Sequence, residues 1–170
     1  ALGSLDPGVV RRVIVPAISN YSRPMLTPRG DQIVFSRREE NRIYIVQWDG
    51  SGLRPLADGY AVDTWLDPED QSEWVVFFSG ARPVNNMGEP AYEAARRCRL
   101  DDPSRVEHVW SGHPIAQLGE NNFQLSADGR YASIHNREAA GVVDIAGQTW
   151  ARYGIGCWPS MVPDSSYRYW

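Results

Sequence analysis

The fold is decided by the stretch SRPMLTPRGDQIVF at residues 22–35, in which two β-prone segments flank Pro-Arg-Gly-Asp. Pro28 fixes φ near the value that the first central position of a type I turn needs. Gly30 can take the positive φ with which a short hairpin returns into its second strand. The stretch therefore predicts a β-hairpin.

The hairpin is one copy of a repeat. Related sequences occur at residues 65–77, 123–134 and 158–169, and the turn positions Pro28, Pro68, Ala127 and Pro163 are spaced 40, 59 and 36 residues apart. In the first copy a second hairpin follows, because residues 42–48 meet the turn pair Asp49-Gly50 and return at residues 53–56. Residues 95–110 and 141–153 repeat that arrangement. Each unit is thus four short strands, and the spacing is close to the ~40 to 45 residues of a propeller blade.

The pattern resembles the TolB-like, PD40 class of WD40-like repeats from bacteria. Residues 24–57 and 123–153 carry it well, with Asp128-Gly129 at one of the turns, whereas residues 65–110 carry it loosely. The copy at Pro68 lacks the glycine and the copy at Pro163 has Ser in its place. The resemblance implies a β-propeller, but it does not imply one activity, since such blades occur in binding, scaffolding and carbohydrate-handling proteins.

We therefore expect an all-β chain with one β-propeller segment of four-stranded antiparallel blades, about half a ring. Three complete blades are predicted at residues 21–57, 62–110 and 121–153. Residues 9–16 would be the outermost strand of a preceding blade, and residues 157–170 the innermost strand of a following one. Insertions are expected at residues 79–90 and 111–122. A fragment of a longer propeller is the favoured interpretation, and a subunit that closes a ring with other copies is the alternative.

Composition narrows the possible partners. The chain has 170 residues, of which 42% are hydrophobic and 22% are charged, and its net charge is −4. A negative net charge disfavours nucleic acid, which needs clustered positive charge. No apolar run approaches the ~18 residues of a membrane span. The two cysteines, Cys98 and Cys157, are expected to be free buried thiols, with a bridge between them as the alternative.

Ligands of propellers meet the loops at one mouth of the central channel, so the predicted loops supply the candidate binding residues. Four arginines there could form a cluster for an anionic sugar or a carboxylate, but nearby glutamates make a solvated face of mixed charge the favoured interpretation. The binding candidates are Arg37, Arg38, Arg82, Asn85, Asn86, His113, Asn121, Asn122, His135 and Arg137.

Aromatic residues fall at the same repeat position, at the entry to each predicted innermost strand: Trp65, Phe123 and Trp158. They could offer stacking platforms to sugars or peptides, but recurrence in every repeat favours packing between blades. The positions predicted to serve the repeat structurally are Pro28, Gly30, Asp49, Gly50, Trp65, Pro68, Phe123, Asp128, Gly129, Trp158 and Pro163.

No catalytic residue, metal site or cofactor is predicted. The three histidines, His108, His113 and His135, are too few for a metal-assisted lyase site within this half, and no nucleophile elbow or phosphate loop is present. We expect a non-catalytic binding or scaffold propeller whose partner is a protein, further blades or a polysaccharide. The resemblance implies a periplasmic or extracellular location. The alternatives are part of a propeller lyase or hydrolase, and the gating propeller of a peptidase.

Overall fold

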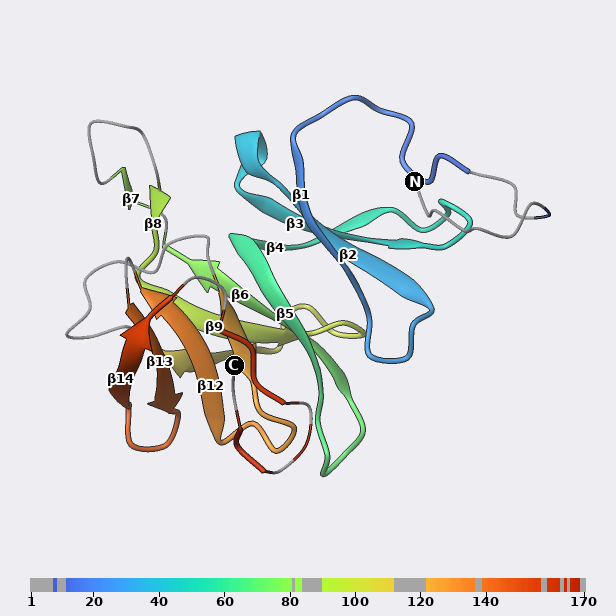
Figure 1. Ribbon diagram of the computed structural model, residues 1–170. Helices are drawn as coiled ribbons and strands as arrows, with labels where there is room; N and C mark the ends of the chain where they lie inside the picture. Colours follow the sequence, from blue (N-terminus) through green and yellow to red (C-terminus); the bar gives the residue numbers. More distant parts are fainter. Residues whose placement is uncertain are drawn as a thin grey trace.

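Three four-stranded antiparallel sheets follow one another along the chain in the computed structural model (Figure 1). We call them blades 1, 2 and 3. The structure describes residues 8, 12–80, 82–83, 90–111, 122–136, 139–156, 159–162, 164 and 166–168. The expected fold class, an all-β chain of β-propeller blades, is confirmed.

The strands of each blade are consecutive in the chain, apart from a small insertion in blade 2. Blade 1 consists of β1 (Tyr21–Leu26), β2 (Gln32–Arg37), β3 (Arg42–Gln47) and β4 (Arg54–Asp58), with the 3-10 turn η1 (Arg38–Glu40) between β2 and β3. Blade 2 consists of β5 (Tyr60–Leu66), β6 (Glu73–Ser79), β9 (Ala94–Arg99) and β10 (Val106–Trp110). The short ribbon of β7 (Arg82–Pro83) and β8 (Pro90–Ala91) lies between β6 and β9. Blade 3 consists of β11 (Phe123–Leu125), β12 (Tyr131–Asn136), β13 (Ala139–Asp144) and β14 (Thr149–Ile155).

The inner hairpin of each blade closes in the same way. The amide of Thr27 donates to the carbonyl of Gln32 at 3.0 Å, and the same bond recurs from Asp67 to Ser72 at 2.9 Å and from Ser126 to Tyr131 at 2.8 Å. The turns also need one residue with positive φ, which is +75° at Gly30 and +70° at Gly129. In blade 2 the positive φ falls one position later, at Gln71 with +60°, and the amide of Gln71 donates to the carbonyl of Asp67. The closing bond is therefore common to the three blades, whereas the turn inside it differs in blade 2.

Apolar side chains at alternating positions of the strands pack in the interfaces between blades. Val34 and Ile45 are fully buried and face blade 2, where they meet Val75, Phe77 and Cys98. A second cluster joins blade 2 to blade 3, and its largest members include Trp74, Phe78, Trp110, Phe123 and Ile134. Because successive side chains of a strand point to opposite faces, each blade offers one such set to each neighbour.

The segment before blade 1 differs from the expected outermost strand. Residues 12–16 form no strand; residues 9–11 lie outside the described part. No strand of the described residues runs beside the segment to supply ladder hydrogen bonds. It is held instead by the outer hairpin of blade 1, where Arg12 Nη2 donates to the carbonyl of Asp49 at 2.6 Å.

Candidate functional site

The innermost strands β1, β5 and β11 lie side by side and are joined by side chains. Thr64 Oγ1 on β5 donates to the carbonyl of Leu26 on β1 at 2.8 Å. The amide of Leu125 on β11 donates to Asp63 Oδ2 on β5 at 3.0 Å. Each contact links one blade to the next along the innermost strands, which line the central channel in a closed propeller. The inner wall is therefore held by specific polar contacts in addition to the apolar clusters behind it.

Two charged side chains belong to this wall. Burial raises the pKa of Asp63 from 3.8 to about 7, against the lowering effect of its bonds from the amides of Leu125 and Thr64 and of the charge of Arg23. Burial also lowers the pKa of Arg23. Arg23 Nη2 donates to Asn122 Oδ1 at 2.8 Å, so the guanidinium reaches from blade 1 to the start of blade 3. We call Arg23, Asp63 and Asn122 the inner-wall cluster.

A cavity of about 340 Å³ opens beside this cluster, at the end where the inner hairpins turn. We call it the turn-side cavity. The residues that line it come from all three blades: Pro28, Asp63, Thr64, Trp65, Leu66, Pro68, Gln71, Gln124, Leu125 and Ala127. It combines one indole ring, a carboxylate and two side-chain amides, the mixture that a small polar ligand requires.

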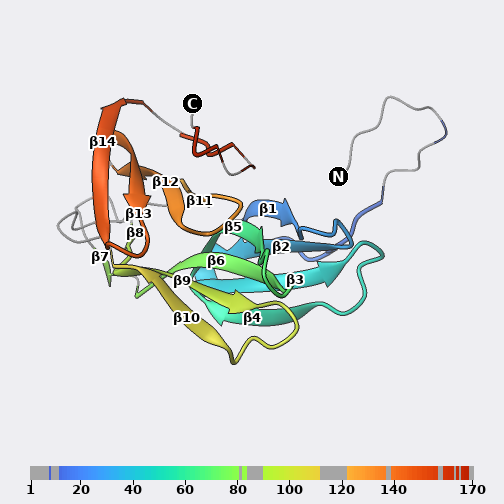
Figure 2. The same cartoon turned by 90° about the horizontal axis from the view of Figure 1, so that it is seen from below.

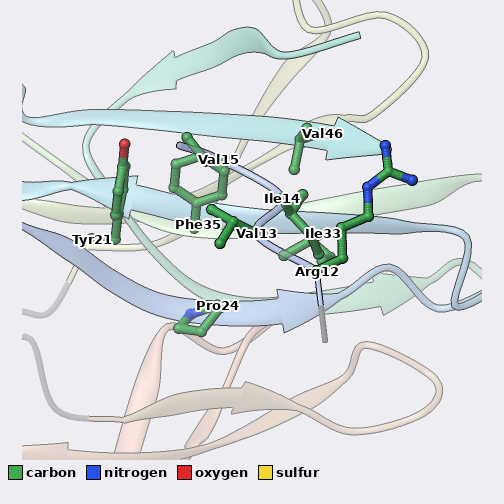
Figure 3. A pocket seen from close by; sticks show the side chains of 9 residues that line it. All are labelled: Arg12, Val13, Ile14, Val15, Tyr21, Pro24, Ile33, Phe35 and Val46. Carbon is green, nitrogen blue, oxygen red and sulfur yellow. The ribbon is translucent and has the colours of Figure 1, made fainter. Parts of the chain in front are cut away.

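A second, more apolar cavity of about 260 Å³ lies on the face of blade 1 that points away from blade 2 (Figure 3). We call this the free face of blade 1. Its lining residues come from residues 12–15 and from β1, β2 and β3: Arg12, Val13, Ile14, Val15, Tyr21, Pro24, Ile33, Phe35 and Val46. Figure 3 shows residues 12–15 crossing over the sheet with the cavity beside them.

The binding candidates named from the loops are only partly placed. Arg37 is held by an ion pair to Glu40 Oε1 at 2.7 Å and packs over the rings of Tyr21 and Tyr44, which gives it a structural role. Arg38 is exposed in η1, and Arg82 begins β7. The other loop candidates, which lie outside the described residues, are Asn85, Asn86, His113, Asn121 and Arg137. The favoured interpretation of these arginines, a solvated face of mixed charge, and its alternative, a cluster that binds an anion, both stay predictions.

Asn122 and His135 are the two candidates that lie in the interior. Asn122 is buried in the inner-wall cluster and donates from Nδ2 to the carbonyl of Pro159. His135 on β12 is 7% exposed, and neither ring nitrogen has a hydrogen-bond partner within the described structure. Burial lowers the pKa of His135, because the charged imidazolium loses hydration there.

The aromatic repeat positions need a correction. Trp65 lies two residues before the hairpin-closing residue Asp67, whereas Phe123 lies three residues before its counterpart Ser126. The two aromatics are therefore not equivalent and point to opposite faces of their strands. Trp158 lies outside the described residues.

Both aromatics nevertheless fill the same interface, between blades 2 and 3. Trp65 Nε1 reaches forward from blade 2 to the carbonyls of Ser126 and Ala127 at 3.1 and 3.2 Å. Phe123 reaches back from blade 3, and its ring centroid is 5.9 Å from that of Phe78. These contacts are packing between blades.

Sequence reasoning missed Arg23 and Asp63. One signal was available, because Asp63 is the single charged residue of the mainly apolar strand Tyr60–Leu66. Arg23 carries a positive φ of +51° beside a β-bulge in β1, which no sequence pattern announces.

The described residues contain no group of three or more His, Cys, Asp or Glu side chains placed to hold a metal ion. Within the same residues no helix is long and apolar enough to cross a membrane.

Comparison with known proteins supports the fold. No protein-family model and no curated protein matches the chain. Among solved structures, an oligogalacturonate lyase in complex with manganese aligns with a TM-score of 0.54 at 12% identity, over 84% of this chain and 42% of that one. The lyase from Vibrio parahaemolyticus gives 0.52 at 13% identity, over 84% and 43%. A chain of the nidogen/laminin complex gives 0.52 at 15% identity, over 81% and 50%.

At this identity the likeness concerns the fold alone. The chain spans half or less of the length of these three structures. The class of protein defined by the three blades is thus a β-propeller segment, and the TolB-like repeat family stays a resemblance.

Proposed function

We propose that the chain is a non-catalytic binding segment of a β-propeller, and that its free face on blade 1 takes up further blades or a protein partner. The observation that supports this is the apolar cavity on that face. Val13 above it is 73% exposed, although it lies beside the ring of Phe35 and the side chain of Ile33 (Figure 3). Phe35 and Val46 on the sheet beneath are only 4% and 1% exposed, so residues 12–15 already cover part of this face and Val13 presents the exposed apolar surface.

The interior of the chain indicates what kind of partner fits. The other face of blade 1 is covered by blade 2 through branched aliphatic and aromatic side chains, including Val34, Ile43, Val75 and Phe77. The free face carries the same kinds of side chain in the intervening positions of β2 and β3. A β-sheet that presents a row of aliphatic side chains is the surface that fits it.

A polysaccharide is the ligand class that we propose for the turn-side cavity. The Trp65 ring, the amides of Gln71 and Gln124 and the carboxyl of Asp63 line it together. Sugars use such combinations of an apolar platform with hydrogen-bonding groups. Export to the periplasm or the cell exterior belongs to the same proposal and rests on the family resemblance. Calorimetric titration with neutral and acidic oligosaccharides tests the ligand class, and the absence of heat for all of them would remove it.

The test of the main proposal compares two substitutions of the same kind. Val13→Glu places a charge on the free face, and Val106→Glu places one on β10, where Val106 is 43% exposed. Light scattering and native mass spectrometry then give the mass and composition of the particle. We expect the unaltered chain and Val106→Glu to be found with further blade-bearing chains, and Val13→Glu to lose them. If the unaltered chain is folded and remains a single chain in the presence of the proteins of its source, the proposal is wrong.

A further inference from the structure

The charge of the turn-side cavity comes from one group, the carboxyl of Asp63. The other described residues of its lining are uncharged, and the polar ones among them are Thr64, Trp65, Gln71 and Gln124. Figure 2 shows β5, the strand that carries Asp63, beside the innermost strands β1 and β11 of the neighbouring blades. A ligand in this cavity therefore meets a carboxyl and several neutral hydrogen-bonding groups.

The guanidinium groups next to the cavity are paired with glutamates. Arg29 Nη1 lies 3.7 Å from Glu73 Oε2. Arg97 lies over the ring of Trp65 and pairs with Glu107 Oε2 at 2.7 Å. Neither arginine belongs to the described lining of the cavity. A carboxylate on a ligand would thus lack the forked guanidinium contact that proteins commonly use to bind this group.

The carboxyl of Asp63 is fixed in place by two backbone amides. The amide of Thr64 donates to Oδ1 at 2.9 Å and that of Leu125 to Oδ2 at 3.0 Å, so each oxygen keeps a second lone pair. The charged group that acts on Asp63 from β1 is Arg23, which favours the ionised form, whereas β11 contributes the uncharged Gln124 and Leu125 to the cavity. Burial outweighs these effects and raises the pKa of Asp63 to about 7.

The two protonation states of Asp63 suit different ligands. The ionised carboxylate only accepts hydrogen bonds, so it binds the hydroxyl groups of a sugar and repels a carboxylate. The protonated carboxyl donates one O–H bond, which a carboxylate on the ligand can accept. The amide side chains of Gln71 and Gln124 carry no charge in either state, and therefore only Asp63 changes the preference of the cavity.

We propose that Asp63 determines the specificity of the turn-side cavity, which selects sugar units without a carboxylate above neutral pH and admits uronic acids when Asp63 is protonated. The inference rests on the proposed function, because it specifies the polysaccharide that binds in this cavity. The observation that supports it is a lining whose charged group is a carboxyl with a free lone pair on each oxygen.

Calorimetric titration with pairs of oligosaccharides that differ only in charge tests this specificity. The probes are tetramers of galacturonate, glucuronate and mannuronate, each beside its carboxyl-reduced neutral form. A uronate keeps its charge at pH 5, since the ordinary pKa of a carboxylic acid is about 4. At pH 8 we expect the neutral form of a pair to bind about tenfold more tightly than the uronate or better, because like charges repel across a contact. At pH 5 the two forms should differ by less than about threefold, because protonated Asp63 carries no charge.

Two variants and a control assign the effect to this cavity. Asp63→Asn keeps an oxygen for the amide of Leu125 but does not titrate, so the ratio of the two affinities should be the same at pH 5 and pH 8. Gln124→Glu keeps an oxygen for the amide of Met161 and adds a second carboxyl to the cavity, which should increase the preference for the neutral form at pH 8. Asp58→Asn is the matched control, because the side chain of Asp58 is 75% exposed on β4 and lies outside the cavity, and it should keep the pH-dependent ratio.

The other outcomes separate this inference from the proposed function. If a uronate binds at pH 8 as tightly as its neutral form or more tightly, the inference is wrong and the polysaccharide proposal stands. The same conclusion follows if Asp63→Asn keeps the pH-dependent ratio of the unaltered chain. If no probe binds at either pH, the polysaccharide proposal is wrong and the inference is wrong with it. Circular dichroism checks each fold, and Gln124→Glu alone decides the test if Asp63→Asn unfolds.

Discussion

Asp63 should make the free energy of unfolding depend on pH, and one substitution can isolate its contribution. Its pKa is raised by burial from 3.8 to about 7 in the folded chain. Between these values the folded chain keeps a proton that the unfolded chain has lost, so the free energy of unfolding falls as pH rises and levels off above about pH 7. In Asp63→Asn the side-chain oxygen can still accept the hydrogen bond from the backbone amide of Leu125. The side chain no longer titrates, so this pH dependence disappears.

The magnitude follows from the shift. Each pKa unit corresponds to about 1.4 kcal/mol, so the fall between pH 5 and pH 8 is at most about 3 kcal/mol. Asp63 keeps partial exposure to solvent, which screens its charge, and we expect about 2 kcal/mol. The free energy of unfolding of Asp63→Asn minus that of the unaltered chain should therefore be larger by about 2 kcal/mol at pH 8 than at pH 5.

Urea unfolding followed by tryptophan fluorescence at both pH values measures this difference. Contributions shared by the two chains, such as that of His135, cancel in the comparison. Asp58→Asn is the matched control, because the side chain of Asp58 is 75% exposed in its ion pair with Arg42 and should change little at either pH. A difference between Asp63→Asn and the unaltered chain that is equal at pH 5 and pH 8 would refute the reasoning. The opposite sign would mean that Arg23 holds Asp63 ionised.

Two further predictions concern packing. A Cβ at Gly129, where φ is +70°, would meet Trp65 Cζ2 at 2.8 Å, whereas one at Gly30, where φ is +75°, meets nothing within 4 Å. Gly30→Ala should cost about 1 kcal/mol of backbone strain, and Gly129→Ala about 1 to 3 kcal/mol more; equal losses in thermal unfolding would contradict the Trp65 contact. Burial raises the pKa of Cys98 to about 12, so in a Cys157→Ser chain this thiol should react with a disulfide reagent about a thousandfold more slowly when folded than in denaturant. Fast reaction of the folded chain would show that Cys98 is accessible.

The hairpins could be predicted because their causes are local. Pro28 restricts φ, Gly30 and Gly50 permit the positive φ of +75° and +85° that their turns need, and the expected turns form at these positions. The strand count of each blade followed from alternation and from these turns. The prediction that Trp65 and Phe123 occupy equivalent positions was wrong. A shift of one residue between repeats changes the face to which a side chain points.

The inner-wall cluster could not be predicted, because its partners are far apart in the chain. Arg23 and Asn122 are 99 residues apart and come together only after two blades have packed. The pKa of Asp63 likewise depends on burial created by neighbouring blades.

The sequence by itself determined the repeat, its turns and the four-stranded blade, since these depend on backbone preferences and on the period of two in a strand. Only the tertiary structure decided which faces remain open and which polar groups meet at the channel wall. Burial and desolvation belong to surfaces made by several blades together, and no single repeat contains them.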